Sequence, residues 1–145
     1  MKASIALLCA LLLLPASLLA ENSTRQGPYT IHHNALTTDV LTPAIASQYG
    51  IERSTGRGMV NISVIREQAG TTGTPVSATV TLKARNLIGQ QRDFPLREVR
   101  EQAAIYYIAD FLVGDRERLI FDIEVEVPGE TYPLKARFEQ EFFTR

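Results

Sequence analysis

The side chains best suited to catalysis or metal binding in this chain are its two histidines, His32 and His33, and the nearby Asp39. Imidazole and carboxylate groups bind zinc and also act as acids and bases in hydrolysis. The histidines fall within a predicted strand, however, and neighbouring residues of a strand project to opposite faces. We therefore favour structural roles for the two rings. A small metal-dependent or hydrolytic enzyme using His32, His33 and Asp39 is the alternative hypothesis.

Sequence patterns that would supply a nucleophile are missing. No serine lies in a Gly-x-Ser-x-Gly motif, and the sequence around Ser54 reads Arg-Ser-Thr-Gly. The single cysteine, Cys9, lies in an apolar N-terminal segment that we expect to be removed. The remaining chain then has no thiol for a disulfide, a zinc site or covalent catalysis. We expect no cofactor and prefer a non-catalytic protein to an enzyme.

Three carboxylates, Asp122, Glu124 and Glu126, share one face of a predicted strand at two-residue spacing. Carboxylate oxygens are the ligands that calcium prefers. The same pattern is typical of a solvated strand face, where charges keep the strand from pairing with another chain. We prefer the solvated face to a calcium site.

The segment between a predicted short helix and the following strand is better suited to recognition. It contains Tyr49, Arg53, Ser54 and Arg57. Loops lie at the surface because their backbone is costly to bury, and tyrosine and arginine are enriched at binding hot spots. We name these four residues as the candidate binding site. The competing interpretation is that Arg53 pairs with a nearby carboxylate and Tyr49 packs the helix onto the fold.

The charge of the chain is balanced and interspersed. Lysine and arginine together number 15 and aspartate and glutamate 16, which gives a formal net charge of −1. No basic tail or stripe of the kind that nucleic acid requires is present. Nucleic acid is therefore set aside, and a protein or a component of the cell envelope is the expected partner.

Residues 1–20 have the pattern of a secretory signal peptide. Lys2 precedes an apolar run that is shorter than the roughly 20 residues of a membrane-spanning helix. We expect cleavage near Ala20 and a soluble periplasmic chain with no stable membrane insertion. Residues 21–145 are enough for one domain, and the sequence leaves its oligomeric state open.

Alternation of apolar and polar residues predicts two β-hairpins. The stretches 60–65 and 76–86 both alternate, and the Gly- and Thr-rich connection 68–75 predicts that they pair with each other. The second hairpin joins 119–127 to 132–142 through a Pro-Gly turn.

Shorter elements complete the predicted fold. Strands are expected at 29–33, at 93–97 after a turn at Gly89-Gln90, and at 105–113, whereas 21–28 is expected to be loose and 97–104 looks helical by composition. A threonine cap, a proline and a final glycine predict a short helix over 42–50. The fold class is all-β: an immunoglobulin-like antiparallel β-sandwich of about seven strands with one short helix.

A family resemblance adds to this prediction. It is carried by His32-His33-Asn34-Ala35, Leu41-Thr42-Pro43, Tyr49-Gly50-Ile51, Arg53-Ser54, Asn61-Ile62-Ser63-Val64 and Glu101-Gln102-Ala103-Ala104-Ile105-Tyr106-Tyr107-Ile108-Ala109. These runs resemble an uncharacterised family of periplasmic proteins of Gram-negative bacteria, the domain of unknown function 4426. The resemblance spans essentially the whole mature chain, implies a periplasmic sandwich-like protein, and assigns no catalytic residue.

The function that these observations favour is an exported, non-catalytic binding or assembly module of the bacterial cell envelope. Such a module would hold its partner through sheet edges or end loops.

Overall fold

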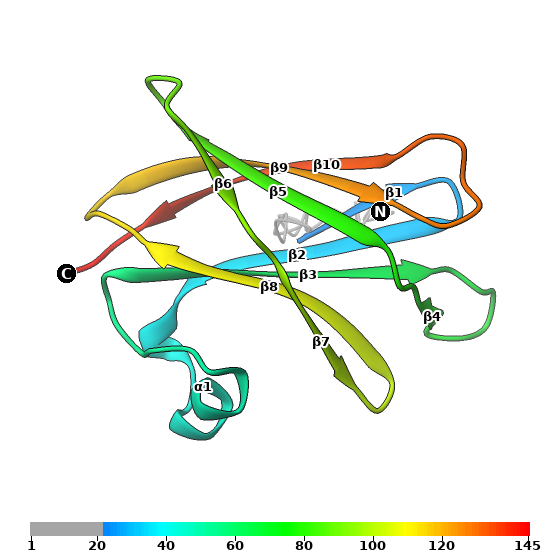
Figure 1. Cartoon of the computed structure of the whole chain (residues 1–145), viewed down its shortest axis with the longest axis horizontal. Helices are drawn as coiled ribbons and strands as arrows, with labels where there is room; N and C mark the ends of the chain where they lie inside the picture. The colour runs from blue at the N-terminus through cyan, green and yellow to red at the C-terminus, as the bar shows by residue number, and fades with distance from the viewer. Residues whose placement is uncertain (1–21) are drawn as a thin grey trace, which may run out of the picture.

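Two antiparallel sheets packed face to face make up the structure, a computed structural model that describes residues 22–145 (Figure 1). Ten strands, one short α-helix and one 3-10 turn lie within these residues. The all-β sandwich prediction is confirmed. The predicted signal peptide, residues 1–20, lies outside the described residues.

The larger sheet, which we call sheet A, has six strands in the order β1-β2-β3-β8-β7, with β4 pairing with one end of β3. Its strands are β1 (Ser23–Gln26), β2 (Tyr29–Thr37), β3 (Arg57–Arg66), β4 (Thr74–Pro75), β7 (Arg97–Glu101) and β8 (Ala104–Leu112).

The smaller sheet, sheet B, has four strands in the order β10-β9-β5-β6. Its strands are β5 (Thr79–Asn86), β6 (Gln91–Phe94), β9 (Glu117–Glu126) and β10 (Leu134–Phe142). The hairpin of β9 with β10 is the second predicted hairpin, which is confirmed along its whole length, from Leu134 opposite Val125 to Phe142 opposite Glu117.

The core lies between the sheets because alternate side chains of each strand turn inward. Phe121 is fully buried at its centre, with ring centroids 4.8 Å from Phe138 and 5.9 Å from Phe111. Phe94 stacks on Phe111 at 4.2 Å, and Phe142 meets both Phe111 and Phe121 edge-on. Aromatic pairs in these geometries add to the stability gained from burial alone.

A short helical segment covers part of the outer face of sheet A (Figure 1). It consists of η1 (Thr38–Val40) and α1 (Pro43–Tyr49), and the predicted cap is present because Ile45 N donates to Thr42 Oγ1 at 3.2 Å. Gly50 ends the helix with φ of 64°, a conformation that glycine adopts without strain. In residues 22–145 no helix has both the length and the apolar character to cross a membrane.

The prediction that 60–65 pairs with 76–86 is wrong. β3 lies in sheet A and β5 in sheet B, so their apolar faces pack against each other across the core. The hairpin partner of β3 is instead the two-residue β4, where Ile65 lies opposite Pro75. Alternation shows which face of a strand is buried, but it does not show to which sheet the strand belongs.

The remaining differences are β1, β4 and β7, three short strands that the sequence pattern did not predict. β1 was expected to be loose, but Gly27 at φ of 56° turns the chain so that Thr24 lies opposite Ile31 of β2. The helical composition of 97–104 is misleading, since β7 pairs with β8 through Val99 and Tyr106. β1 and β7 are edge strands with few buried side chains, so both lack a clear apolar pattern.

Candidate functional site

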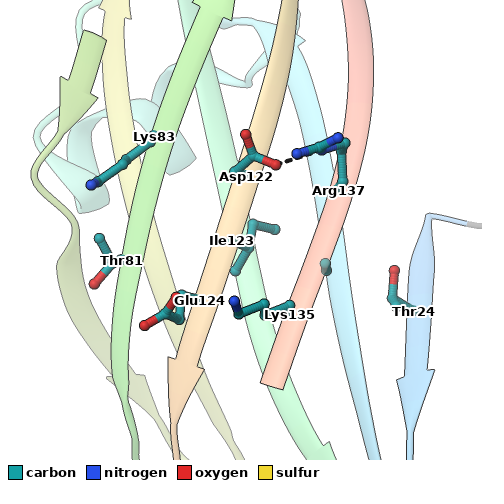
Figure 2. A pocket seen from close by; sticks show the side chains of 9 residues that line it. Thr24, Thr81, Lys83, Asp122, Ile123, Glu124, Lys135 and Arg137 are labelled. Carbon is teal, nitrogen blue, oxygen red and sulfur yellow. Dashed lines mark hydrogen bonds and ion pairs between the residues drawn. The ribbon is translucent and has the colours of Figure 1, made fainter. Parts of the chain in front are cut away.

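One candidate site is an open hollow of about 620 Å³ on the outer face of sheet B (Figure 2). Strands β5, β9 and β10 form it, and β1 approaches from the opposite sheet. Its lining residues are Thr24, Thr81, Lys83, Asp122, Ile123, Glu124, Lys135, Ala136 and Arg137. Apart from Ile123 and Ala136, whose side chains belong to the buried core, the lining is polar or charged.

Strand register places these charges in rows across the sheet. One row runs from Lys83 on β5 through Asp122 on β9 to Arg137 on β10. Arg137 Nε is ion-paired with Asp122 Oδ1, the interaction drawn in Figure 2, and Arg85 Nε lies 4.0 Å from Asp122 Oδ2. Charges of opposite sign on adjacent strands therefore alternate along the row.

The next row contains Thr81, Glu124 and Lys135. Among residues 22–145, Lys83, Glu124 and Lys135 take part in none of the ion pairs. The hollow thus offers charges of both signs and a hydroxyl group to a partner. Such a surface suits a partner that itself carries both signs.

The carboxylates of β9 do not assemble into a cation site in the described part of the chain. Asp122 is committed to arginine, and no group of three or more His, Cys, Asp or Glu residues within 22–145 is placed to hold a metal ion. Glu124 and Glu126 are exposed on this face.

The two histidines lie on opposite faces of β2, as the alternation predicts. His32 is exposed, whereas His33 is 5% exposed and stacks on Phe138 with ring centroids 4.5 Å apart. His33 Nε2 lies 3.2 Å from Thr24 Oγ1, and Nδ1 has no hydrogen-bond partner in residues 22–145. Burial lowers the pKa of His33 below its usual 6.5, and the charge of His32 lowers it further. This environment keeps the ring neutral.

Asp39 does not join the histidines. It lies in η1, beyond the end of β2 at Thr37, and Thr37 is five positions along the strand from His32, a distance of about 17 Å. The structure therefore brings none of the three proposed catalytic groups into one site, and nothing in it favours the enzyme alternative.

Tyr49 anchors α1 to sheet A. Its hydroxyl donates to Glu101 Oε1 at 2.7 Å, and its carbonyl accepts from Arg97 Nη1 at 2.8 Å. The hydrogen bond to Glu101 raises the pKa of Tyr49 to about 12. The ring packs beside a second small core formed by Ile51, Met59 and Ile108.

The other three residues of the predicted binding segment are also held by the fold. Arg57 Nε donates to Asp110 Oδ2 at 2.9 Å, and Arg53 Nη2 donates to the Asp39 carbonyl at 3.0 Å. Ser54 Oγ accepts from Gly56 N at 3.1 Å. These contacts describe how the loop is positioned, and binding by this segment stays a prediction.

Sequence analysis did not identify the hollow on sheet B. The signal for half of it was present, because a hairpin with a Pro-Gly turn brings Asp122 opposite Arg137 and Glu124 opposite Lys135. The contribution of Lys83 could not be found in this way, since it depends on β5 pairing with β9 across a long stretch of chain.

Two antiparallel sheets, a short helix on one outer face and a charge-lined hollow on the other define an all-β sandwich domain. The chain belongs to the DUF4426 family, a domain of unknown function, whose model matches residues 23–145.

A crystal structure of a DUF4426 family protein from Pseudomonas aeruginosa PAO1 is 34% identical, with a TM-score of 0.70, covering 85% of this chain and 94% of that one. A copper-bound variant of FetP from uropathogenic Escherichia coli strain F11 is 9% identical, with a TM-score of 0.58, covering 87% of this chain and 92% of that one. The second likeness is one of fold alone. No curated protein matches this chain.

Proposed function

We propose that this domain is an exported, non-catalytic binding or assembly module of the bacterial cell envelope, and that its partner is a protein or an envelope component. Export to the periplasm is supported by the signal-peptide pattern of residues 1–20. A binding role is supported by a hollow whose lining is mostly charged and polar.

The observation that carries the proposal is the hollow on sheet B. It is formed by regular strands, which hold side chains more rigidly than loops do, and its uncommitted groups carry both signs of charge. Complementary charge gives association its specificity and its speed. We infer that a partner with charges of both signs docks here.

Copper binding, the property in the name of the FetP structure, is not part of this proposal. FetP shares only 9% of its residues with this chain, and here His32 and His33 diverge from each other. The hollow is instead lined by lysine, arginine and carboxylate side chains that alternate in charge.

The test is affinity capture from envelope extract. The bait is the protein that the cell produces from the full-length gene, purified after any processing by the cell. The double variant Lys83→Ala with Glu124→Ala removes two uncommitted charges of the hollow without changing net charge. We expect it to lose at least tenfold of the affinity that the unmodified protein shows for the captured partner, and salt to weaken the same complex.

The matched control is Arg25→Ala with Glu52→Ala, which also leaves net charge unchanged and removes two exposed charges outside the hollow. It should bind as the unmodified protein does. Equal binding by both double variants, with unchanged thermal midpoints, would show that the hollow is not the recognition surface.

A further inference from the structure

The edge of sheet B formed by β10 is long and carries no strand partner within residues 22–145. β10 has nine residues, whereas the other sheet edges are formed by β1, β6 and β7, of four, four and five residues. In Figure 2, β10 has β9 on one side, and the strands on its other side, β2 and β1, both belong to sheet A. Long unpaired edges are templates for another strand, and proteins usually keep them short.

The backbone groups that face this edge can be identified from one hydrogen bond. Lys135 N donates to Gln26 Oε1 of β1 at 2.9 Å and so points away from β9. Alternate residues of a strand direct their backbone groups to the same side. Arg137 and Glu139 therefore present their N–H and C=O groups to the free edge, as does Glu141, whose carbonyl accepts from Gln140 Nε2 at 2.9 Å.

The side chains of these edge-facing residues have a particular order of charge. Two basic residues, Lys135 and Arg137, are followed by two acidic residues, Glu139 and Glu141, all on the outer face of sheet B. In an antiparallel pair of identical strands centred on Phe138, Lys135 lies opposite Glu141 of the partner subunit and Arg137 opposite Glu139 of the partner subunit. Every pair then unites opposite charges, and the interface is its own complement under a two-fold axis.

We propose that β10 pairs antiparallel with β10 of a second copy of this chain, which joins the two sheets B into one continuous eight-stranded sheet. The edge-facing groups of Arg137 and Glu139 exchange backbone hydrogen bonds with those of the partner's Glu139 and the partner's Arg137. Lys135 and Arg137 also line the hollow, so the two sites adjoin, but the inference does not rest on the proposed function, and molar mass tests it separately from capture of a partner.

The ion pairs within one copy do not use up the charges at the two ends of β10 that the dimer requires. Arg118 alone serves both Glu139, at 3.2 Å, and Glu141, at 3.1 Å, so this end of β10 has an excess of negative charge. Lys135 at the other end makes no ion pair with any of residues 22–145. Antiparallel pairing places the acidic end of one β10 strand opposite the basic end of the other.

The inner face of the edge also fits a second copy. Phe138 stacks between His33 and Phe121, yet it is only partly buried where β10 stands at the border of the sheet. On the two-fold axis it lies beside Phe138 of the partner subunit. Aromatic cross-strand pairs are among the favourable ones in sheets.

The experiment measures molar mass by sedimentation and light scattering at micromolar protein concentration. The sample is the unmodified protein, expressed from the full-length gene and purified after any processing by the cell. We expect a dimer. Arg137→Glu places two carboxylates opposite each other in both central pairs, and Glu139→Arg places two guanidinium groups there. Each variant alone should be monomeric.

Mixing the two charge-reversal variants gives the decisive result. A heterodimer of Arg137→Glu with Glu139→Arg restores opposite charges in both central pairs, so the equimolar mixture should return to the mass of a dimer. Asp93→Arg, on the same face of the sheet but three strands away on β6 and outside the hollow, should leave the dimer intact. If either reversal fails to fold, Arg137→Gln with Glu139→Gln removes the charges without repulsion and should raise the dissociation constant of the dimer about tenfold.

Three results would overturn the proposal. They are a monomeric unmodified protein over the whole concentration range, a dimer that both reversals leave unchanged, and folded single variants that stay monomeric when mixed.

Discussion

The ring of His33 lies parallel to the ring of Phe138, with an interplanar angle of 11° and 4.5 Å between centroids. The two residues come from different sheets, so this stack closes the sandwich where β2 and β10 approach each other. A neutral imidazole suits this place, whereas an imidazolium would bring a charge into the core.

The stability of the protein should therefore fall as the pH drops below 6.5. The pKa of His33 is lowered in the folded state, so above pH 6.5 the ring is neutral whether the chain is folded or unfolded. Below that value the unfolded chain takes up the proton first, which favours unfolding by at most about 1.4 kcal/mol per pH unit. Urea melts between pH 7.5 and about 5 measure this slope.

His33→Phe is the matched variant, because it retains an aromatic stack on Phe138 and removes the titrating group. The slope between pH 6.5 and about 5 should be smaller in this variant than in the unmodified protein. Identical slopes would mean that other groups cause the pH dependence.

Gly58 lies in a closely packed part of the core, and this packing leads to a second prediction. A methyl group at this position would lie 2.7 Å from Phe111 Cε2 and 3.1 Å from Phe142 Cε1, both of which belong to packed rings. Gly58→Ala should cost about 1–3 kcal/mol in the free energy of unfolding. At Gly56 the nearest atom to such a methyl group is Ser54 Oγ at 3.7 Å, so Gly56→Ala should change stability little. Denaturant melts of the two variants compare them directly.

Sequence patterns predicted the strands whose two faces differ and failed where they do not. Most of the predicted strands follow from alternation because one face is buried, as in β9, where Phe121, Ile123 and Val125 are all buried. In β3 and β8 the outer face is partly buried as well, through Met59 and Ile108. β1 and β7 are edge strands without a clear apolar face, so neither has a periodic signal.

Sequence analysis was less successful in predicting how strands far apart in the chain pair with each other. The β9–β10 hairpin was predicted because two strongly alternating runs flank a short connection that contains Pro-Gly. Whether β5 lies beside β3 or across the core from it depends on the total packing of both sheets, and the local pattern is the same in either case. The hollow on sheet B and the free edge of β10 both depend on this arrangement.

Arg57 and Arg53 should differ in their effect on stability. Arg57 forms a partly exposed ion pair with Asp110, whose other oxygen lies 3.6 Å from Arg97. Arg57→Ala should cost about 1 kcal/mol, since solvent screens the pair and Arg97 remains. Arg53→Ala removes one exposed hydrogen bond to a carbonyl and should leave the thermal midpoint nearly unchanged.

The same pair of variants tests the predicted binding segment. If Arg53→Ala weakens capture of an envelope partner at unchanged stability, the loop recognises that partner. If binding per folded molecule is unaffected by either variant, the arginines serve the fold alone.

Thr38 is the residue on which the position of this loop depends most. It is fully buried, and its hydroxyl donates to the Glu52 carbonyl at 2.7 Å and accepts from Ser54 N at 2.9 Å. One side chain thus satisfies two backbone groups of the segment that leads from α1 into β3.

Thr38→Val keeps the shape of the side chain but removes both hydrogen bonds, so two backbone groups lose their partner and unfolding should become easier by about 1–3 kcal/mol. Thr38→Ser keeps the hydroxyl and loses one methyl group, which should cost only about 1 kcal/mol. Hydrogen exchange measures where the loss falls. Ser54 N bonds to the Thr38 side chain and not to a strand, so its amide should exchange much faster in Thr38→Val than in Thr38→Ser. The amides of β9, which lie in the sheet, should exchange slowly in both variants. Equal protection of the Ser54 amide in the two variants would show that packing around the loop, and not this hydroxyl, holds it in place.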